Sequence, residues 1–288
     1  MKTESFQSIN PLGLHRLVYQ EWGERDNPRV IICVHGLARN SRDFDELAWA
    51  LSRDYRVVCP DVVGRGQSDW LPAGSPYGVP QYVQDMVALI ARLNVSQLDW
   101  IGTSMGGLIG MVLAAYPESP IQRLVLNDVG PFVAQKPLSR IGRYVGQDQR
   151  FNTLDEVEAL LRQHYSAYRG LSAQQWSALA QHGSRRTEDG RFALHYDPVI
   201  GEYTRAAAGQ DIDLWALWQK ISGPQLLMWG EDSDVLTADT VNRMQQLNDR
   251  LELSSWPGIG HAPSLMEPDQ IRTVLDWLQV DGHLNMHE

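Results

Sequence analysis

The segment Gly102-Thr103-Ser104-Met105-Gly106 decides the fold class of this 288-residue chain. It follows an apolar run at 98–102 that predicts a strand, and it opens an apolar run at 105–116 that predicts a helix. Glycine two residues before and two residues after Ser104 leaves room for a very tight strand-to-helix turn with unfavourable backbone angles. Such a turn lifts the serine hydroxyl above the edge of a sheet. The segment therefore predicts a nucleophilic serine, and a glycine-rich turn with an incidental serine is the alternative.

The segments on both sides of this turn alternate between strand and helix patterns. Before residue 130, strands are expected at 12–22, 29–34, 56–59, 98–102 and 123–127, and helices at 41–51, 82–93 and 105–116. After residue 223, strands are expected at 225–229 and 251–256, and helices at 238–247 and 268–278. This order predicts an α/β fold with a mostly parallel central sheet and helices on both faces.

Residues 131–211 interrupt this alternation, because they contain mostly helical patterns and no strong strand. We expect residues 1–130 and 212–288 to form the core domain and residues 131–211 to form an inserted helical cap. Such an insert usually covers the carboxyl ends of the strands, where open α/β sheets bind their ligands. Most of its aromatic side chains are expected to pack the cap onto the core, and some to line an apolar pocket for the substrate.

A histidine that could activate the serine stands in the segment Gly260-His261. It follows the strand expected at 251–256, so the loop would return it to the carboxyl edge of the sheet, near Ser104. A serine hydroxyl is a poor nucleophile until a base takes its proton, and imidazole titrates near neutrality. We therefore expect His261 to be the general base, with an ordinary surface or core histidine as the alternative.

Three aspartates could orient this histidine. Asp232 and Asp234 both follow the strand expected at 225–229, and Asp128 follows the strand expected at 123–127. We prefer Asp234, because apolar residues follow it and should anchor it toward the core, whereas Asp232 has more polar neighbours. All three candidates keep the chain order serine, aspartate, histidine that accompanies such a turn.

A second functional loop is expected at His35-Gly36-Leu37, directly after the strand at 29–34. The Leu37 N–H and the Met105 N–H are the expected donors of an oxyanion hole, which binds the negative charge that develops on a carbonyl oxygen under attack. Met105 would stand at the start of a helix, where the dipole favours negative charge. An ordinary turn is the alternative for the first loop.

Composition excludes several classes of protein. Hydrophobic residues make up 43% and charged residues 21%, and 25 basic against 35 acidic residues give a net charge of −10, which argues against a nucleic-acid or anionic-membrane partner. We expect no secretory signal, no membrane span, no metal and no cofactor, and the sequence specifies no oligomeric state. Cys33 and Cys59 are expected to be buried free thiols in a cytoplasmic protein; one disulfide and a periplasmic location are the alternatives.

Taken together, these segments resemble the α/β-hydrolase superfamily and, within it, a bacterial esterase-like branch. The resemblance covers most of the chain outside the insert and is carried by His35-Gly36, 61–68, 102–107, 230–234 and Gly260-His261. It implies a Ser-Asp-His triad. The usual spacing in the family places an aspartate where Ser233 stands, and the segment Ser233-Asp234 resembles the acid turn of the esterase-like branch. Haloalkane dehalogenases and epoxide hydrolases carry an aspartate at the position of Ser104, so the resemblance excludes them.

The resemblance predicts hydrolysis of a small-molecule ester, thioester or lactone through an acyl-enzyme on Ser104. A carbon–carbon bond hydrolase or an acyltransferase with the same triad is one alternative, although Ala38-Arg39-Asn40 replaces the glycine-rich stretch of the carbon–carbon hydrolases. A ligand-binding protein without catalysis is the other, and it would need no activated serine. With Asp234 as the acid, Asp234→Asn should lower turnover by about ten-thousand-fold.

Overall fold

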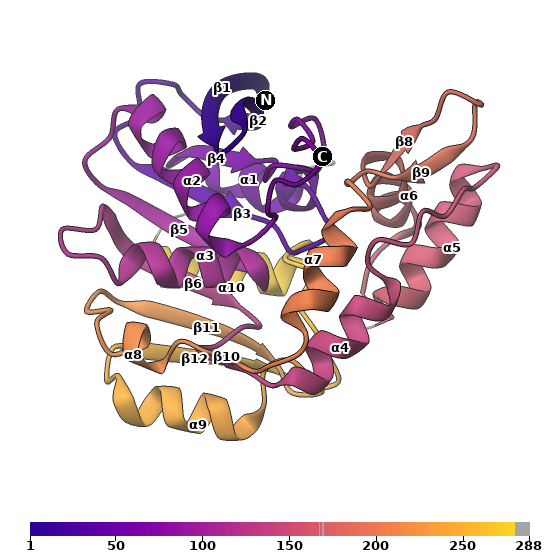
Figure 1. Ribbon diagram of the computed structural model, residues 1–288. Coiled ribbons are helices and arrows are strands. Elements are labelled where there is room, and N and C mark those ends of the chain that lie inside the picture. The colour runs from indigo at the N-terminus through magenta and orange to yellow at the C-terminus, as the bar shows by residue number, and fades with distance from the viewer. Residues whose placement is uncertain (167, 169, 280–288) are drawn as a thin grey trace.

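A computed structural model describes residues 1–166, 168 and 170–279 of the chain (Figure 1). The strands of its main sheet are β1 (Lys2–Asn10), β2 (Gly13–Trp22), β3 (Val30–Val34), β4 (Arg56–Pro60), β5 (Leu98–Thr103), β6 (Ile121–Asn127), β11 (Gln225–Gly230) and β12 (Leu251–Trp256). Within the described residues this sheet has eight strands in the order β1-β2-β4-β3-β5-β6-β11-β12. The strands from β4 to β12 in this order run parallel to one another. At the other edge, β2 pairs antiparallel with both β4 and β1. The predicted α/β fold with a mostly parallel sheet is confirmed.

Helices cover both faces of this sheet (Figure 1). One face packs against α2 (Val79–Leu93), α3 (Met105–Ala114) and α9 (Ala238–Leu247), and the other against α1 (Asp45–Leu51) and α10 (Pro268–Leu278). The short turn η1 (Ser41–Phe44) leads into α1.

The central strand β3 shows how the sequence produces two cores. Successive side chains of a strand point to opposite faces. Accordingly, Val30, Ile32 and Val34 join the cluster beneath α2 and α3, whereas Ile31 and Cys33 join the cluster beneath α1 and α10. A strand that is buried on both faces has to be apolar throughout, which is why the pattern of this segment could be read from the sequence.

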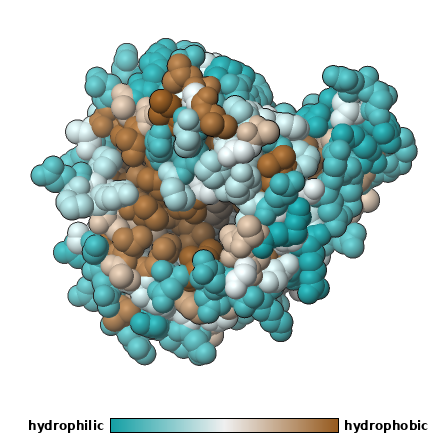
Figure 2. All heavy atoms as spheres, in the orientation of Figure 1, coloured by the Kyte–Doolittle hydropathy of each residue, from teal (hydrophilic) through white to brown (hydrophobic). Residues whose placement is uncertain are grey.

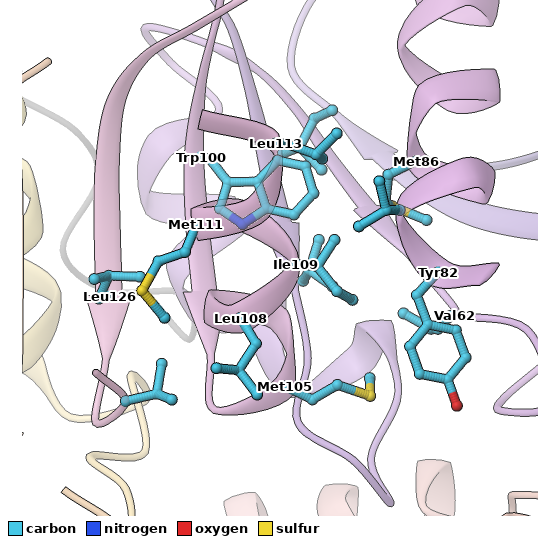
Figure 3. Close-up of a cluster of buried hydrophobic side chains, with 14 of the residues drawn as sticks. Val62, Tyr82, Met86, Trp100, Met105, Leu108, Ile109, Met111, Leu113 and Leu126 are labelled. Carbon is cyan, nitrogen blue, oxygen red and sulfur yellow. The ribbon is translucent and has the colours of Figure 1, made fainter. Parts of the chain in front are cut away.

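Helix α3 is almost entirely buried, and its apolar side chains pack on the sheet and on α2 (Figure 3). Trp100 of β5 lies against this helix and donates a hydrogen bond from Nε1 to the Gly106 carbonyl oxygen at 3.0 Å. Met105 and Ile109 project from the same helix into the cluster that contains Met86 and Tyr82 (Figure 3). This packing fixes the start of α3, and with it the turn that carries Ser104.

Strand β1 was not expected from the sequence. It forms a hairpin with β2 in which Asn10 pairs with Gly13, whose φ is +142°. Along β1, exposed polar side chains alternate with a few buried ones, so this edge strand has no apolar run that would mark it. Elsewhere in the sheet, Cys33 and Cys59 are buried free thiols.

Between β6 and β11 the chain leaves the sheet and forms the insert, defined here as residues 131–211. Its elements, with the two that follow, are β7 (Phe132–Val133), α4 (Gln135–Tyr144), α5 (Leu154–His164), α6 (Ala173–His182), β8 (Ser184–Arg186), β9 (Phe192–Leu194), α7 (Ile200–Ala207), β10 (Ile212–Asp213) and α8 (Trp215–Trp218). Strands β7 and β10 pair and so join the two ends of the insert. The short hairpin of β8 and β9 was not expected, because three-residue strands leave no periodic pattern.

The insert projects from the sheet on the side where the parallel strands end (Figure 1). Its helices α4 and α7 contact each other, and α5 contacts α6. None of the helices in the described part of the chain is long and apolar enough to cross a membrane.

Candidate active site

Ser104 lies on a strained turn between β5 and α3. Its φ is 51° and its ψ is −112°, outside the regions that side chains with a Cβ prefer. A Cβ added to Gly102 would lie 2.3 Å from the backbone of Gly106, and one added to Gly106 would lie 2.0 Å from the Val34 carbonyl oxygen. Neither contact involves a side chain that could move away. The glycines are therefore required by close backbone approach, as the sequence predicts.

This steric requirement gives a prediction for Gly106→Ala. The new methyl group cannot avoid the Val34 carbonyl oxygen without a shift of β3 or α3, so we expect a loss of about 3 kcal/mol or more in the free energy of unfolding. Urea unfolding followed by circular dichroism measures the change. The matched control is Gly209→Ala, where the added Cβ would meet its nearest atom at 3.8 Å. Equal stability of the two variants would contradict the steric account.

His261 follows β12 and reaches back to the serine. Its Nε2 lies 2.9 Å from Ser104 Oγ, within hydrogen-bond distance. The loop is tied to the sheet by Asn127, whose side-chain amide donates to the Pro263 carbonyl oxygen at 2.8 Å and to Thr103 Oγ1 at 3.0 Å. The structure thus brings together the two residues that the sequence proposes as nucleophile and base.

The carboxylate that contacts His261 belongs to Asp128, which stands directly after β6. Its Oδ2 lies 2.6 Å from His261 Nδ1, and its side chain is fully buried. The same carboxylate accepts a hydrogen bond from the Gly230 N–H at 2.9 Å and one from the Ser233 hydroxyl at 2.5 Å. Asp128 has a φ of 54°, which aspartate tolerates better than most residues. Ser104, His261 and Asp128 form the candidate triad.

The prediction that Asp234 orients His261 is wrong. The Asp234 side chain is half exposed and forms two hydrogen bonds with Arg140 of the insert, at 2.7 and 2.8 Å. Asp232, the other candidate in this loop, is exposed. The structure selects Asp128, the third candidate considered from the sequence.

The reason for this error lies in the loop around Ser233. The apolar residues that follow, Val235 and Leu236, are buried as expected, but their N–H groups both donate to Ser233 Oγ at 3.2 Å. These two donors direct the Ser233 hydroxyl proton to the carboxylate of Asp128. The buried residues Val235 and Leu236 therefore hold Ser233 beside the site, and the Asp234 side chain points toward the insert.

The loop after β3 approaches the same serine. A Cβ added to Gly36 would lie 3.9 Å from the Cβ of Ser104. His35 Nε2 accepts a hydrogen bond from the Val62 N–H at 3.0 Å, so its Nδ1 donates to the Gly36 carbonyl oxygen at 2.7 Å. Burial lowers the pKa of His35 to about 3, which keeps the ring neutral in this arrangement.

Arg65, in the segment 61–68 that carries part of the family resemblance, supports this loop as well. Its side chain is fully buried, and its Nε donates to the Leu37 carbonyl oxygen at 2.9 Å. Fixing this carbonyl group also fixes the peptide chain around the Leu37 N–H. Met105 is the first residue of α3, so its N–H has no acceptor within the helix. Leu37 and Met105 both line the cavity at Ser104, which agrees with their proposed part as oxyanion donors.

Two cavities meet at Ser104, and Leu37 and Ile141 line both. The apolar cavity lies between α3, α4 and α7. The polar cavity is lined by His261 together with charged and tyrosine side chains. Figure 2 shows a hollow in the face that the core and the insert share, bordered by hydrophobic surface. Among the described residues no cluster of histidine, cysteine or acidic side chains could hold a metal ion.

Comparison with known proteins establishes the class. The sequence model of the family described as alpha/beta hydrolase fold matches residues 29–268, so the chain belongs to this family. The site geometry described above lies within that range.

More specific similarity comes from individual relatives. The chain is 46% identical over 273 residues to the 3-hydroxybutyrate-oligomer hydrolase of Cupriavidus necator, covering 92% of this chain and 93% of the relative. It is 26% identical to the bifunctional esterase/perhydrolase of Acinetobacter calcoaceticus, over 90% of this chain and 94% of that protein. The crystal structure of an alpha/beta hydrolase from Novosphingobium aromaticivorans superposes with a TM-score of 0.85 at 37% identity, covering 96% of this chain and 98% of that one.

Proposed function

We propose that this protein is a serine hydrolase of carboxylic esters and that its substrates are short esters of 3-hydroxybutyrate type. One observation carries the reaction class: a hydroxyl, an imidazole and a buried carboxylate in line, with Ser104 Oγ 2.9 Å from His261 Nε2 and His261 Nδ1 2.6 Å from Asp128 Oδ2. This constellation activates a hydroxyl for attack on a carbonyl carbon.

The first half of the reaction acylates the serine. Ser104 Oγ attacks the ester carbonyl carbon while its proton passes to His261 Nε2, and the negative charge on the carbonyl oxygen is bound by the Leu37 and Met105 N–H groups. Collapse of the intermediate breaks the bond between the carbonyl carbon and the alcohol oxygen. The proton on Nε2 goes to that oxygen, and the alcohol leaves.

The second half reverses these proton movements with water. His261 takes a proton from a water molecule that attacks the acyl-enzyme, and Ser104 receives the proton back as the acid leaves. Throughout the cycle Asp128 accepts the hydrogen bond of His261 Nδ1, which keeps Nε2 facing the serine. The carboxylate also stabilises the imidazolium that forms in each half.

The substrate class rests on similarity over almost the whole chain. The similarity to the relative named as a 3-hydroxybutyrate-oligomer hydrolase covers 92% of this chain, so it includes most of the insert as well as the core. The apolar cavity suits a short aliphatic acyl group, since Leu108, Val133 and Leu138 are among its lining residues.

The test is hydrolysis of synthetic linear 3-hydroxybutyrate dimer and trimer, beside p-nitrophenyl esters of increasing acyl length. We expect each ester bond to yield one carboxylic acid and one alcohol, measured by titration and chromatography. In water labelled with oxygen-18 the label should enter the acyl product, as hydrolysis of an acyl-enzyme requires. No turnover of any ester would contradict the proposal and would favour a carbon–carbon hydrolase, an acyltransferase or a binding protein.

A further inference from the structure

The polar cavity contains a buried arginine that the reaction just described does not use. Arg39 follows the Leu37 loop, is only 6% exposed, and lines the cavity together with Ser104 and His261. Tyr165 and Tyr168 of the insert line the same cavity. Their rings stack with centroids 5.3 Å apart, and the Arg39 guanidinium carbon lies 5.4 Å from the centre of the Tyr165 ring.

The chemistry of acyl transfer assigns a part of the substrate to each cavity. The leaving alcohol has to take its proton from His261 Nε2, so it must lie on the His261 side of the serine. His261 lines the polar cavity, whereas the oxyanion candidate Met105 lines the apolar one. The acyl group therefore occupies the apolar cavity, and the alcohol occupies the polar cavity beside Arg39.

Arg39 brings a charged guanidinium to the polar cavity. Its Nε and Nη2 hold the carboxylate of Asp43, which also lines the cavity, at 2.5 to 3.1 Å. Its Nη1 makes no hydrogen bond among the described residues and lies near Gly183 of the insert. Although burial disfavours the charged form, Asp43 raises the pKa of Arg39 above its ordinary value, so the guanidinium stays charged. Burial also raises the pKa of Tyr165 and of Tyr168, which keeps both hydroxyls protonated as potential donors.

We propose that the Arg39 side of the polar cavity is a carboxylate subsite for the leaving group. The preferred substrate is an ester whose alcohol part is itself a hydroxy acid, and its free carboxylate binds the Arg39 guanidinium with help from the tyrosine hydroxyls. Such an ester is cleaved next to its carboxyl end, and a hydroxy acid leaves with the proton from His261. The guanidinium donates charge-assisted hydrogen bonds to the carboxylate, and these are stronger than bonds to a neutral acceptor such as an amide. This inference rests on the proposed ester hydrolysis.

The experiment compares two substrates that differ only in charge: the 3-hydroxybutyrate dimer as the free acid and the same dimer as its carboxamide. We expect kcat/KM of the wild-type protein to be about 10- to 100-fold higher for the acid, the range of a hydrogen bond to a charged group. Arg39→Met should reduce this ratio to about one, and Arg39→Lys should retain part of it.

Two further variants make the result specific. Arg42→Met is the matched control, because Arg42 pairs with Asp45 in the same way at 2.5 to 2.9 Å but does not line the polar cavity; it should keep the wild-type ratio. The double change Arg39→Met with Asp43→Leu removes the ion pair as a whole, so no buried carboxylate is left unpaired if Arg39→Met folds poorly.

The two possible failures can be told apart. Equal kcat/KM of the wild type for acid and amide, or an unchanged ratio in both Arg39 variants that fold, would overturn the subsite while ester hydrolysis stands. Absence of any ester turnover by the wild type would overturn the proposed function itself. If Arg42→Met reduced the acid-to-amide ratio of kcat/KM as much as Arg39→Met does, the effect would be structural, and this result would also overturn the subsite.

Discussion

Asp128→Asn is expected to lower kcat for ester hydrolysis by about ten-thousand-fold, the loss found when the aspartate of a serine-protease triad becomes asparagine. An amide has nearly the shape of the carboxylate, but its NH2 group cannot accept the hydrogen bond of His261 Nδ1. The ring would then hold its proton on Nε2 and could not take one from Ser104. The Asp128 carboxylate also accepts hydrogen bonds from the Gly230 N–H and the Ser233 hydroxyl, and an amide NH2 group in place of either oxygen would lose an acceptor.

The matched control is Asp234→Asn, which changes an aspartate to asparagine in the loop after β11. Asp234 pairs with Arg140 at the surface, and such exposed pairs contribute about 0–1 kcal/mol. We expect its kcat to stay within about twofold of the wild type, and its folding stability to change by less than about 1 kcal/mol. The reverse result, a nearly normal Asp128→Asn and an inactive Asp234→Asn, would return the acid to the position preferred from the sequence.

A third variant tests whether the loop after β11 can place a carboxylate beside His261. Ser233 Oγ lies 2.5 Å from Asp128 Oδ2, so a carboxylate at position 233 would approach the same ring nitrogen of His261. Asp128→Asn combined with Ser233→Asp should recover part of the lost kcat. No recovery in a folded protein would show that the loop after β11 cannot deliver a carboxylate to His261.

The parts of the fold that could be predicted are those whose sequence signal is local. Strand β3 is buried on both faces and therefore apolar throughout, and the glycine at 102 is imposed by the backbone of Gly106, four residues further on. The edge strand β1 lacks such a signal, because its pairing with β2 is made by backbone groups while its side chains are largely polar. The pattern of apolar residues alone cannot report that pairing.

The acid of the triad could not be predicted with the same security, because it depends on contacts between distant segments. Asp128 and the loop after β11 are about one hundred residues apart and meet through the pairing of β6 with β11, in which the Asp128 N–H donates to the Met228 carbonyl oxygen at 2.8 Å. A shift of one residue along that loop decides which side chain contacts Asp128 and His261. The Ser233 hydroxyl contacts the triad, and the next residue, Asp234, faces Arg140 of the insert.

The residues that the sequence interpretation missed share one property. Arg39 and Arg65 are buried arginines, and the sequence analysis gave neither of them a role in the site. A buried guanidinium needs specific acceptors, which Asp43 provides in one case and the carbonyl groups of Leu37 and Val63 in the other. Those acceptors become visible only once the tertiary contacts are known, although an arginine two residues after Leu37 was itself a signal.

Ser104→Ala is expected to lower kcat by about a million-fold, the order of loss found when the serine of a triad is removed. The variant should fold normally, because alanine replaces serine at the same strained φ of 51° and adds no atom to the turn. An unchanged thermal midpoint beside the lost turnover of the 3-hydroxybutyrate dimer would assign the loss to chemistry. Turnover within about a hundredfold of the wild type would contradict Ser104 as the nucleophile, since substrate binding and the oxyanion hole retain only about 10³- to 10⁴-fold over water.

Combining Ser104→Ala with Asp128→Asn tests whether the three residues act as one catalytic unit or contribute independently to kcat. If Ser104, His261 and Asp128 act as one unit, the carboxylate has nothing to support once the nucleophile is gone. The double variant should then have the same residual kcat as Ser104→Ala alone, instead of the further ten-thousand-fold loss that independent effects would give. A multiplied loss would mean that Asp128 stabilises the site in a way that does not pass through His261, and the contact of 2.6 Å would then be structural.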